Sequence, residues 1–469
     1  MSAAQPAAAR RGGRWIDEWD PENESFWERE GKHVARRNLI WSVTSEHIGF
    51  SVWSMFSVLA LFMGPEYGID PAGKFFLVAV ASLVGACLRV PYGFAVARFG
   101  GRNWTIISAG LLLLPTTALV LVMEPGTSYT TFMLVAMLTG VGGANFASSM
   151  TNINSYYPMR LKGWALGVNA GGGNIGVAVV QLVGLGVIAA FGDGRPRVML
   201  MIYIPLIVLA TVFSARYMNN LGPVRNDAGA AREAAREGHT WIMSFLYIGT
   251  FGSFIGYSFA FGLVLQNQFD RTPLEAASLT FLGPLLGSLI RPVGGQLADR
   301  FGGARITLGN FALMAVATSV VVAASMSESL ALFITGFIIL FVLTGLGNGS
   351  TYKMIPGIFQ AKAAAAGMTG EAAYAYARRL GGASMALIGA VGALGGLGIN
   401  LALRQSFLSA GNATGAFVAF LCYYVVCFLV TWAVYLRRSS LAAGGSADPG
   451  GAGAADEGSK DGRPAYAGV

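Results

Sequence analysis

Two arginines lie deep inside apolar stretches of the sequence, and they are the residues best able to carry a function. Arg89 interrupts the stretch FFLVAVASLVGACLRVPYGF, and Arg291 follows LLGSLI. Each precedes the arginine at the end of its stretch, Arg98 or Arg300, by nine residues. That spacing is about 14 Å along a helix, close to half the thickness of a bilayer core. A charge at that depth costs at least about 2.5–3.5 kcal/mol, so each arginine needs a partner or a purpose.

The chemistry of these two arginines indicates an anion. Glu46 is the only clear carboxylate within the apolar stretches, and one carboxylate cannot neutralise two separated guanidinium groups. Two structural ion pairs are the alternative, but the apolar stretches supply almost no acids for them. A guanidinium is a planar fork that bonds two oxygens at once and keeps its proton. One such group in each half of the chain predicts a site for a planar oxyanion.

A glycine-rich stretch, GWALGVNAGGGNIGVAVVQLVGLG over residues 163–186, is the second feature with functional potential. Its glycines leave one helix face without side chains, which permits a close helix crossing or the approach of a ligand to the backbone. Asn174 lies among them as a polar group at membrane depth that needs a partner, and its amide could donate to an anion. A looser counterpart, IGAVGALGGLG, covers residues 388–398. We expect the glycines of the two stretches to serve in gating and helix packing; a face of small residues with only a structural role is the alternative. The glycines concerned are Gly167, Gly171, Gly172, Gly173, Gly176, Gly389, Gly392 and Gly395.

The chain that positions these residues is too apolar for a soluble protein. Of its 469 residues, 54% are apolar and only 12% are charged, whereas a soluble domain carries about 25% charged residues. This composition excludes an ordinary cytosolic enzyme, a disordered chain and a secreted module. Because a bilayer crossing needs about 20 apolar residues, the sequence predicts an all-α polytopic membrane protein. Twelve transmembrane helices are expected at roughly 39–63, 73–98, 104–123, 129–157, 163–191, 198–218, 241–268, 274–299, 304–324, 329–360, 371–400 and 412–436.

An internal repeat divides the chain into two halves. The segment RVPYGFAVARFGGRNWT at 89–105 aligns without gaps on RPVGGQLADRFGGARIT at 291–307, at an offset of 202 residues. Repeats of this kind are typical of secondary transporters, whose site lies near the bilayer midplane between the repeats. We therefore expect two pseudo-symmetric six-helix halves and three further segments. In chain order, the five parts are a cytoplasmic N-terminal segment (1–38), the first half (39–218), a cytoplasmic linker (219–240), the second half (241–436) and a disordered cytoplasmic tail (437–469).

The basic residues predict how the chain is oriented in the membrane. The net charge is +8, and the basic residues concentrate in the loops that are cytoplasmic if the N-terminus is cytoplasmic. By the positive-inside rule, both termini are then cytoplasmic. The sequence contains no HExxH motif, haem-binding histidine pair, nucleophile elbow or phosphate-binding loop. We therefore expect no enzyme activity, catalytic residue, metal or cofactor, and no nucleic-acid partner.

Several motifs resemble one transporter family. The second repeat resembles the Gly-x-x-x-Asp-Arg-x-Gly loop of the major facilitator superfamily, whereas the first repeat has Ala97 at the acidic position. That loop comprises Gly295, Asp299, Arg300 and Gly302. Over residues 19–436 the chain resembles the NarK-type nitrate/nitrite porters of that superfamily. The segments that carry this resemblance are LRVPYGF, GANFASSMTNI, the glycine-rich stretch at 163–176, WIMSFLYIGTFGSFIGYS and GLGNGSTYKMI.

The resemblance implies a function and a set of binding residues. It implies a monomeric transporter that carries nitrate and nitrite across the cytoplasmic membrane by a rocker-switch alternating-access mechanism, in nitrate respiration or assimilation. Arg89 and Arg291 would grip the anion, and Asn174 would help to bind it. Phe50 and Phe146 would sandwich the planar anion, while Tyr247 and Phe251 would complete the pocket. Ala170 is a departure, because the family commonly has glycine there.

The sequence leaves open whether nitrate transport is coupled to nitrite, to protons or to neither. Two arginines that do not titrate cannot readily carry a proton, and a bound anion would neutralise their mutual repulsion. These considerations favour nitrate/nitrite antiport. Glu46 lies one helical turn from Phe50, and an intramembrane acid is a candidate proton carrier, so proton-coupled nitrate symport is one alternative. A facilitator for another small anion is the other.

Overall fold

The computed structural model describes residues 14–222 and 227–437, and these form helices almost throughout. The first half contains β1 (Trp15–Ile16), α1 (Glu24–Phe26), η1 (Trp27–Gly31), α2 (Lys32–Phe62), η2 (Pro65–Tyr67), α3 (Pro71–Phe99), α4 (Gly101–Leu111), α5 (Leu113–Val122), α6 (Tyr129–Thr139), α7 (Val141–Tyr156), α8 (Met159–Phe191) and α9 (Pro196–Tyr217). The remainder contains β2 (Asn220–Leu221), α10 (Ala228–Arg236), α11 (Gly238–Tyr247), η3 (Ile248–Gly252), α12 (Ser253–Gln268), α13 (Pro273–Thr280), α14 (Leu282–Phe301), α15 (Gly303–Met326), α16 (Leu330–Ala365), α17 (Gly370–Ala410), α18 (Thr414–Thr431) and η4 (Trp432–Leu436).

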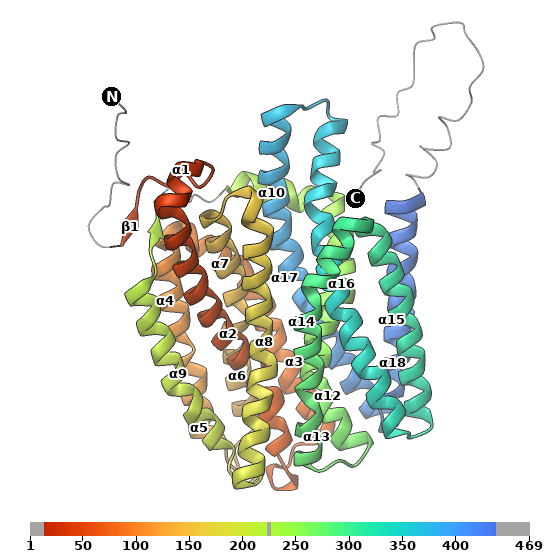
Figure 1. The fold of residues 1–469 in the computed structure, drawn as a ribbon. Coiled ribbons are helices and arrows are strands. Elements are labelled where there is room, and N and C mark those ends of the chain that lie inside the picture. The colour runs from red at the N-terminus through yellow and green to blue at the C-terminus, as the bar shows by residue number, and fades with distance from the viewer. Residues whose placement is uncertain (1–13, 223–226, 438–469) are drawn as a thin grey trace, which may run out of the picture.

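The prediction of an all-α polytopic membrane protein is confirmed. In the described part of the chain, eleven helical stretches are long and apolar enough to cross a membrane. The twelfth predicted crossing is α2, a 31-residue helix that packs along α8. In Figure 1 the helices of the first half, red to yellow, lie mostly on the left, and those of the second half, green to blue, lie mostly on the right. The predicted tail at 437–469 lies outside the described residues apart from Arg437.

Two helix boundaries differ by seven residues or more from those expected. Helix α2 begins at Lys32, seven residues before the predicted position 39, and α17 continues to Ala410, ten residues beyond position 400. Both extensions contain charged or amide side chains, which lower hydropathy without breaking a helix. Hydropathy reports the apolar part of a crossing helix, so it misses polar turns that continue the same helix.

The internal repeat predicted from the sequence corresponds to a repeated backbone geometry. Helices α3 and α14, which carry Arg89 and Arg291, end at Gly100 and Gly302. These two glycines have φ values of +87° and +91°, in a region that side chains other than glycine rarely adopt. In each half the next helix begins immediately afterwards. The two arginines are therefore fixed at the same distance from equivalent helix ends.

The glycine-rich face of α8 brings this helix against α2. A Cβ atom added at Gly176 would overlap the main-chain carbonyl oxygen of His47, and one at Gly173 would overlap the Glu46 carboxyl group. His47 Nδ1 in turn lies 3.1 Å from the carbonyl oxygen of Gly172. The close crossing expected from the sequence is thus present at these three glycines.

One side of the bundle is tied together by the N-terminal segment and the linker. Strand β1 pairs in parallel with β2, which follows α9. The side chain of Asn38 accepts from the backbone N–H of Asn219 at 2.8 Å. Beyond residues 223–226, Arg379 of α17 pairs with Asp227 and Glu233 at 2.5 and 2.9 Å. We call this the linker side; Figure 1 shows it at the top, where α10 is labelled.

Substitution of Gly176 tests the close packing of α8 on α2. Gly176→Ala forces a methyl group onto a backbone carbonyl that cannot rotate away, so we expect a destabilisation of about 1–3 kcal/mol. The measurement is the thermal unfolding midpoint of the detergent-purified protein. Gly167→Ala is the matched control, because nothing lies within 4 Å of a Cβ added there. An unfolding midpoint of Gly176→Ala equal to that of the control would show that the crossing tolerates a side chain.

Candidate functional site

Arg89 lies at the boundary between the two halves. Its side chain is only 2% exposed. Its Nε donates to the carbonyl oxygen of Gly143 on α7 at 3.2 Å, and its Nη1 donates to that of Gly389 on α17 at 2.7 Å. Its Nη2 is buried and has no hydrogen-bond partner among the described residues. Arg89 therefore binds the backbones of both halves and still keeps one N–H group free.

Aromatic rings surround this guanidinium. Its central carbon lies 4.7 Å from the ring centroid of Phe146 and 4.9 Å from that of Phe251. Phe146 and Phe251 are stacked at 6.0 Å, and Phe251 is stacked on Tyr247 at 5.3 Å. Phe50 packs against Phe146 at 6.2 Å. The four aromatic residues that the resemblance implied for the pocket thus form one continuous group.

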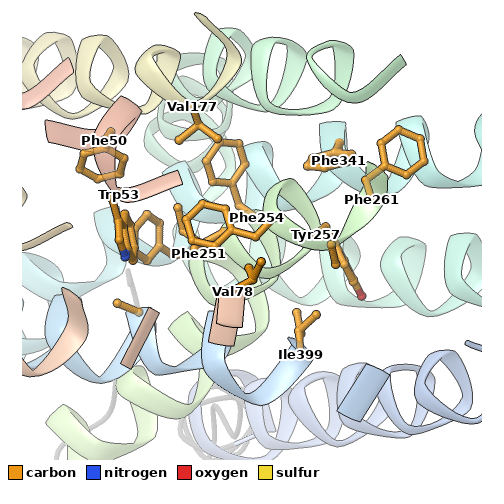
Figure 2. Close-up of a cluster of buried hydrophobic side chains, with 14 of the residues drawn as sticks. Phe50, Trp53, Val78, Val177, Phe251, Phe254, Tyr257, Phe261, Phe341 and Ile399 are labelled. Atoms are coloured by element: carbon orange, nitrogen blue, oxygen red, sulfur yellow. The ribbon is translucent and has the colours of Figure 1, made fainter. Parts of the chain in front are cut away.

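Trp53 is an aromatic neighbour that the sequence analysis missed. It lies one helical turn from Phe50 on α2, and its ring centroid is 5.5 Å from the Arg89 guanidinium. Figure 2 shows Trp53 close to Phe50, and their ring centroids are 5.3 Å apart. Cation–π contacts of this kind stabilise a buried cation by up to about 2 kcal/mol when it is desolvated. A tryptophan in an apolar run carries no sequence signal that separates this role from packing.

Arg291 occupies the matching position in the second half. It is 7% exposed, and its Nη2 donates to the hydroxyl of Tyr247 at 3.4 Å. Its guanidinium carbon lies 5.8 Å from the ring centroid of Tyr352 on α16. Its Nη1 is buried without a hydrogen-bond partner in the described part of the chain. Tyr352 lies within the segment GLGNGSTYKMI but was not singled out from the sequence.

The unpaired polar groups of the site are complementary to an anion. No carboxylate lies within 4 Å of Arg89 or Arg291 among residues 14–222 and 227–437. Arg89 Nη2 and Arg291 Nη1 are NH2 groups without hydrogen-bond partners within the described residues, and the buried Asn174 adds an unpartnered donor, Nδ2, and an unpartnered acceptor, Oδ1. Buried polar groups without partners are costly. The oxygens of an anion would accept from the three donors and offset the charge of the arginines, whereas Asn174 Oδ1 would need a donor.

A cavity leads to Arg291 from the linker side. Its volume is about 2210 Å³, and its wall includes Arg291, Tyr352, Gly167, Gly171 and the exposed Trp164. Arg89, Asn174 and the ring group of Phe50, Phe146, Tyr247 and Phe251 are buried and lie outside this wall. The cavity therefore reaches one arginine of the site, whereas the other is enclosed.

On the opposite side of Arg89 the two halves are in contact. Phe75 of α3 stacks on Phe407 of α17 at 5.2 Å. The side-chain amide of Gln181 on α8 donates to the carbonyl oxygen of Ser258 on α12 at 2.8 Å. Trp53 packs edge-on against Phe259 of α12 at 5.3 Å. The site is thus approached by a cavity on the linker side and covered by contacts between the halves on the other side.

Comparison with known proteins decides the family. Residues 47–397 match the Major Facilitator Superfamily. The chain is 39% identical to the nitrate/nitrite transporter NarU of Escherichia coli over 90% of this chain and 96% of that protein. The chain belongs to the NarK-type nitrate/nitrite porters of this superfamily.

Two further comparisons support this placement. The chain is 30% identical to the probable nitrate/nitrite antiporter NarK2 of Thermus thermophilus over 91% of this chain and 98% of that protein. Its fold resembles the crystal structure of a D-xylose–proton symporter, with a TM-score of 0.63, 15% sequence identity, and coverage of 84% of this chain and 96% of that chain. Because its relatives are transporters, this porter is a membrane transporter and not an enzyme.

The second glycine-rich stretch of this porter packs directly on the site. The carbonyl oxygen of Gly389 accepts from Arg89. Cβ atoms added at Gly392 and Gly395 would overlap the ring of Tyr247 and the backbone of Gly252. In the first stretch, Gly173 and Gly176 face α2, Gly167 and Gly171 line the cavity, and Gly172 lies against Val43 of α2 while also lining the cavity. The two stretches thus lie at the pocket and at the helix crossings beside it; their part in gating stays a prediction.

The superfamily loop of this porter is also placed by the structure. Asp299 pairs with Lys353 of α16 at 2.9 Å, and the Arg300 guanidinium lies 5.1 Å from the ring centroid of Phe301. Both charged groups of the loop line the cavity, as do Gly295 and Gly302. In the first half Ala97 has no acidic group with which to make the corresponding contact.

Glu46 joins three helices close to the site. Its Oε2 accepts from Asn169 of α8 at 2.7 Å and also from the hydroxyl of Ser149 on α7. Glu46 lies one turn from Phe50 on α2, and Ser149 lies one turn from Phe146 on α7. The carboxyl group is buried and is absent from the cavity wall. Its direct partners all belong to the first half, and we therefore expect it to help position the aromatic residues of that half.

Substitution of Glu46 tests this positioning role. Glu46→Leu leaves the buried donors of Ser149 and Asn169 without their acceptor, which should cost about 1–3 kcal/mol of stability. Glu46→Gln keeps an acceptor oxygen of the same shape, so we expect most of that stability to remain. The measurement is the thermal unfolding midpoint of each purified variant. Equal midpoints for wild type and Glu46→Leu would show that the three-helix contact contributes nothing.

Proposed function

We propose that the protein exchanges nitrate for nitrite across the cytoplasmic membrane, with the anion held between Arg89 and Arg291. The observation that carries this proposal is the pair of buried guanidinium groups, each with one free N–H and neither with a carboxylate within 4 Å in the described part of the chain. Nitrate and nitrite are small planar oxyanions that suit such donors between aromatic walls. The names of the relatives support the same substrates.

The arrangement of the halves supports alternating access. Arg89 binds the carbonyl oxygen of Gly389 across the boundary, and Arg291 binds Tyr247 within its own half. The cavity opens on the linker side while the other side is covered. We assign the linker side to the cytoplasm because its loops carry the excess of basic residues. Rocking of one half against the other around the two arginines would then open the opposite side, and one monomer would suffice.

Antiport follows from the charges at the site. Two guanidinium groups in a low-dielectric pocket repel each other, and an anion between them removes the repulsion. The halves would therefore close readily around an anion and slowly without one. Neither arginine changes its charge at physiological pH, so the two groups proposed to hold the anion cannot themselves carry a proton.

Proton-coupled nitrate symport is the second candidate, and one observation favours it. Glu46 is buried, acts electrostatically on Arg89, and has one oxygen, Oε1, without a partner among the described residues. That oxygen could hold a proton. Against this, the carboxyl group is absent from the cavity wall and is bonded within the first half. A facilitator for another small anion has no specific observation in its favour.

Substitution of Arg89 by lysine tests the role of the planar guanidinium. Lysine keeps the charge but cannot contact Gly143, Gly389 and an anion through one planar fork. Because each hydrogen bond to a charged group contributes about 1.5–3 kcal/mol, nitrate binding should weaken by about 100-fold. The measurement is calorimetric titration of the purified protein with nitrate. Arg216→Lys at the end of α9 is the control, and an unchanged affinity in Arg89→Lys would refute the bidentate grip.

Counterflow in proteoliposomes tests the coupling. For antiport, labelled nitrate should enter only when the vesicles contain nitrate or nitrite, and a pH gradient alone should drive no uptake. Robust nitrate uptake under a pH gradient without internal anion would instead favour symport. Glu46→Gln then separates the causes: loss of proton-driven uptake with exchange retained would assign the coupling to Glu46.

A further inference from the structure

Two glutamine side chains join the halves of the protein, in addition to the contact of Arg89 with α17. The side-chain amide of Gln181 on α8 donates to the main-chain carbonyl oxygen of Ser258 on α12 at 2.8 Å. In the reverse direction, the amide of Gln266 on α12 donates to the carbonyl oxygen of Leu61 on α2 at 3.1 Å. Each bond therefore ties a side chain of one half to the backbone of the other.

The contact of Gln181 lies about two helical turns beyond the site, on the side away from the linker, which we call the far side. Gln181 follows Asn174 by seven residues along α8, and Ser258 follows Phe251 by seven residues in the second half. Seven residues are about 10 Å along a helix. Both helical stretches begin on the linker side. The contact thus lies between the pocket and the far side.

The surroundings of Gln181 make this bond part of a seal. Gln181 is only 3% exposed, and its Oε1 has no partner in the described part of the chain. The Ser258 hydroxyl donates to the carbonyl oxygen of Phe254 at 2.6 Å, so it is the backbone of Ser258 that holds Gln181. The next residue, Phe259, packs edge-on against Trp53 of the first half. Gln181 is therefore the polar member of a contact that is otherwise aromatic.

We propose that Gln181, with Gln266 further out, is a latch of the transport cycle that keeps the far side closed while the cavity is open on the linker side. This inference rests on the alternating access of the proposed function. Opening the far side separates α8 from α12, so the amide must leave Ser258, and entering water then hydrates both groups. The net contribution of one hydrogen bond corresponds to a factor of about two to ten in the ratio of the two conformations. The unpartnered Oε1 lowers that advantage, which lets the latch open in each cycle.

The test measures the two conformations directly, by double electron–electron resonance between spin labels on the protein in lipid nanodiscs. The three native cysteines are replaced by alanine. The labels are attached to Asp193→Cys and Ser327→Cys on the far side, or to Arg36→Cys and Glu371→Cys on the linker side; all four native residues are exposed, and each pair spans the two halves. Gln181→Met keeps the length of the side chain but removes its amide. In this variant we expect the ratio of far-open to far-closed molecules to rise about two- to tenfold, with longer distances in the first pair and shorter distances in the second.

Gln268→Met is the matched control, because Gln268 lies on the far side of α12 but donates to Ser325 within its own half. An unchanged ratio in Gln181→Met, or an equal rise in Gln268→Met, would overturn the latch. If Gln181→Met does not fold, Gln266→Met decides: a rise of the ratio supports the latch, and an unchanged ratio refutes it. The distances are measured without substrate. Absence of nitrate exchange by the wild type would therefore overturn the proposed function separately from any result on the latch.

Discussion

The rest of the structure depends on one electrostatic constraint, the burial of two guanidinium groups without carboxylate partners nearby in the described residues. Removing such ions from water is expensive, and the protein offsets the cost only in part. Carbonyl oxygens of Gly143 and Gly389, the Tyr247 hydroxyl and aromatic faces supply partial negative charge but no full charge. What remains is a site with positive charge and free N–H groups, which the proposed small anion would complete.

The glycines are a consequence of this constraint. A carbonyl oxygen in a helix is normally occupied by its own N–H partner and is covered by side chains. Arg89 reaches the carbonyl oxygen of Gly389 because no side chain shields that stretch of α17. Tyr247 packs where Gly392 leaves room, and the next contact joins the backbones of Gly395 and Gly252. Through these contacts α17 of the second half packs directly against Arg89 of the first half.

The two arginines, their equivalent places before the ends of α3 and α14, and the all-α membrane fold could be predicted from the sequence, because charge scarcity and an internal repeat are strong signals in an apolar chain. Trp53 and Tyr352 could not, since aromatic residues in membrane helices usually pack and nothing in their spacing marks the exceptions. The carbonyl partners were equally invisible, because any residue supplies a carbonyl group. The start of α2 at Lys32 was missed because its first turns are polar.

The location of Glu46 explains how a carboxyl group can lie near a site proposed to bind anions without occupying it. A carboxylate in direct contact with Arg89 would compete with the substrate for the same N–H groups. Here the carboxyl group is instead held by Ser149 and Asn169, on helices that also carry Phe146 and Asn174. The acid thus stabilises the first half as a rigid unit, while the arginines stay free of carboxylate partners. In the proposed alternating-access cycle, separation of these two tasks would let one half move against the other without breaking the buried polar contacts within it.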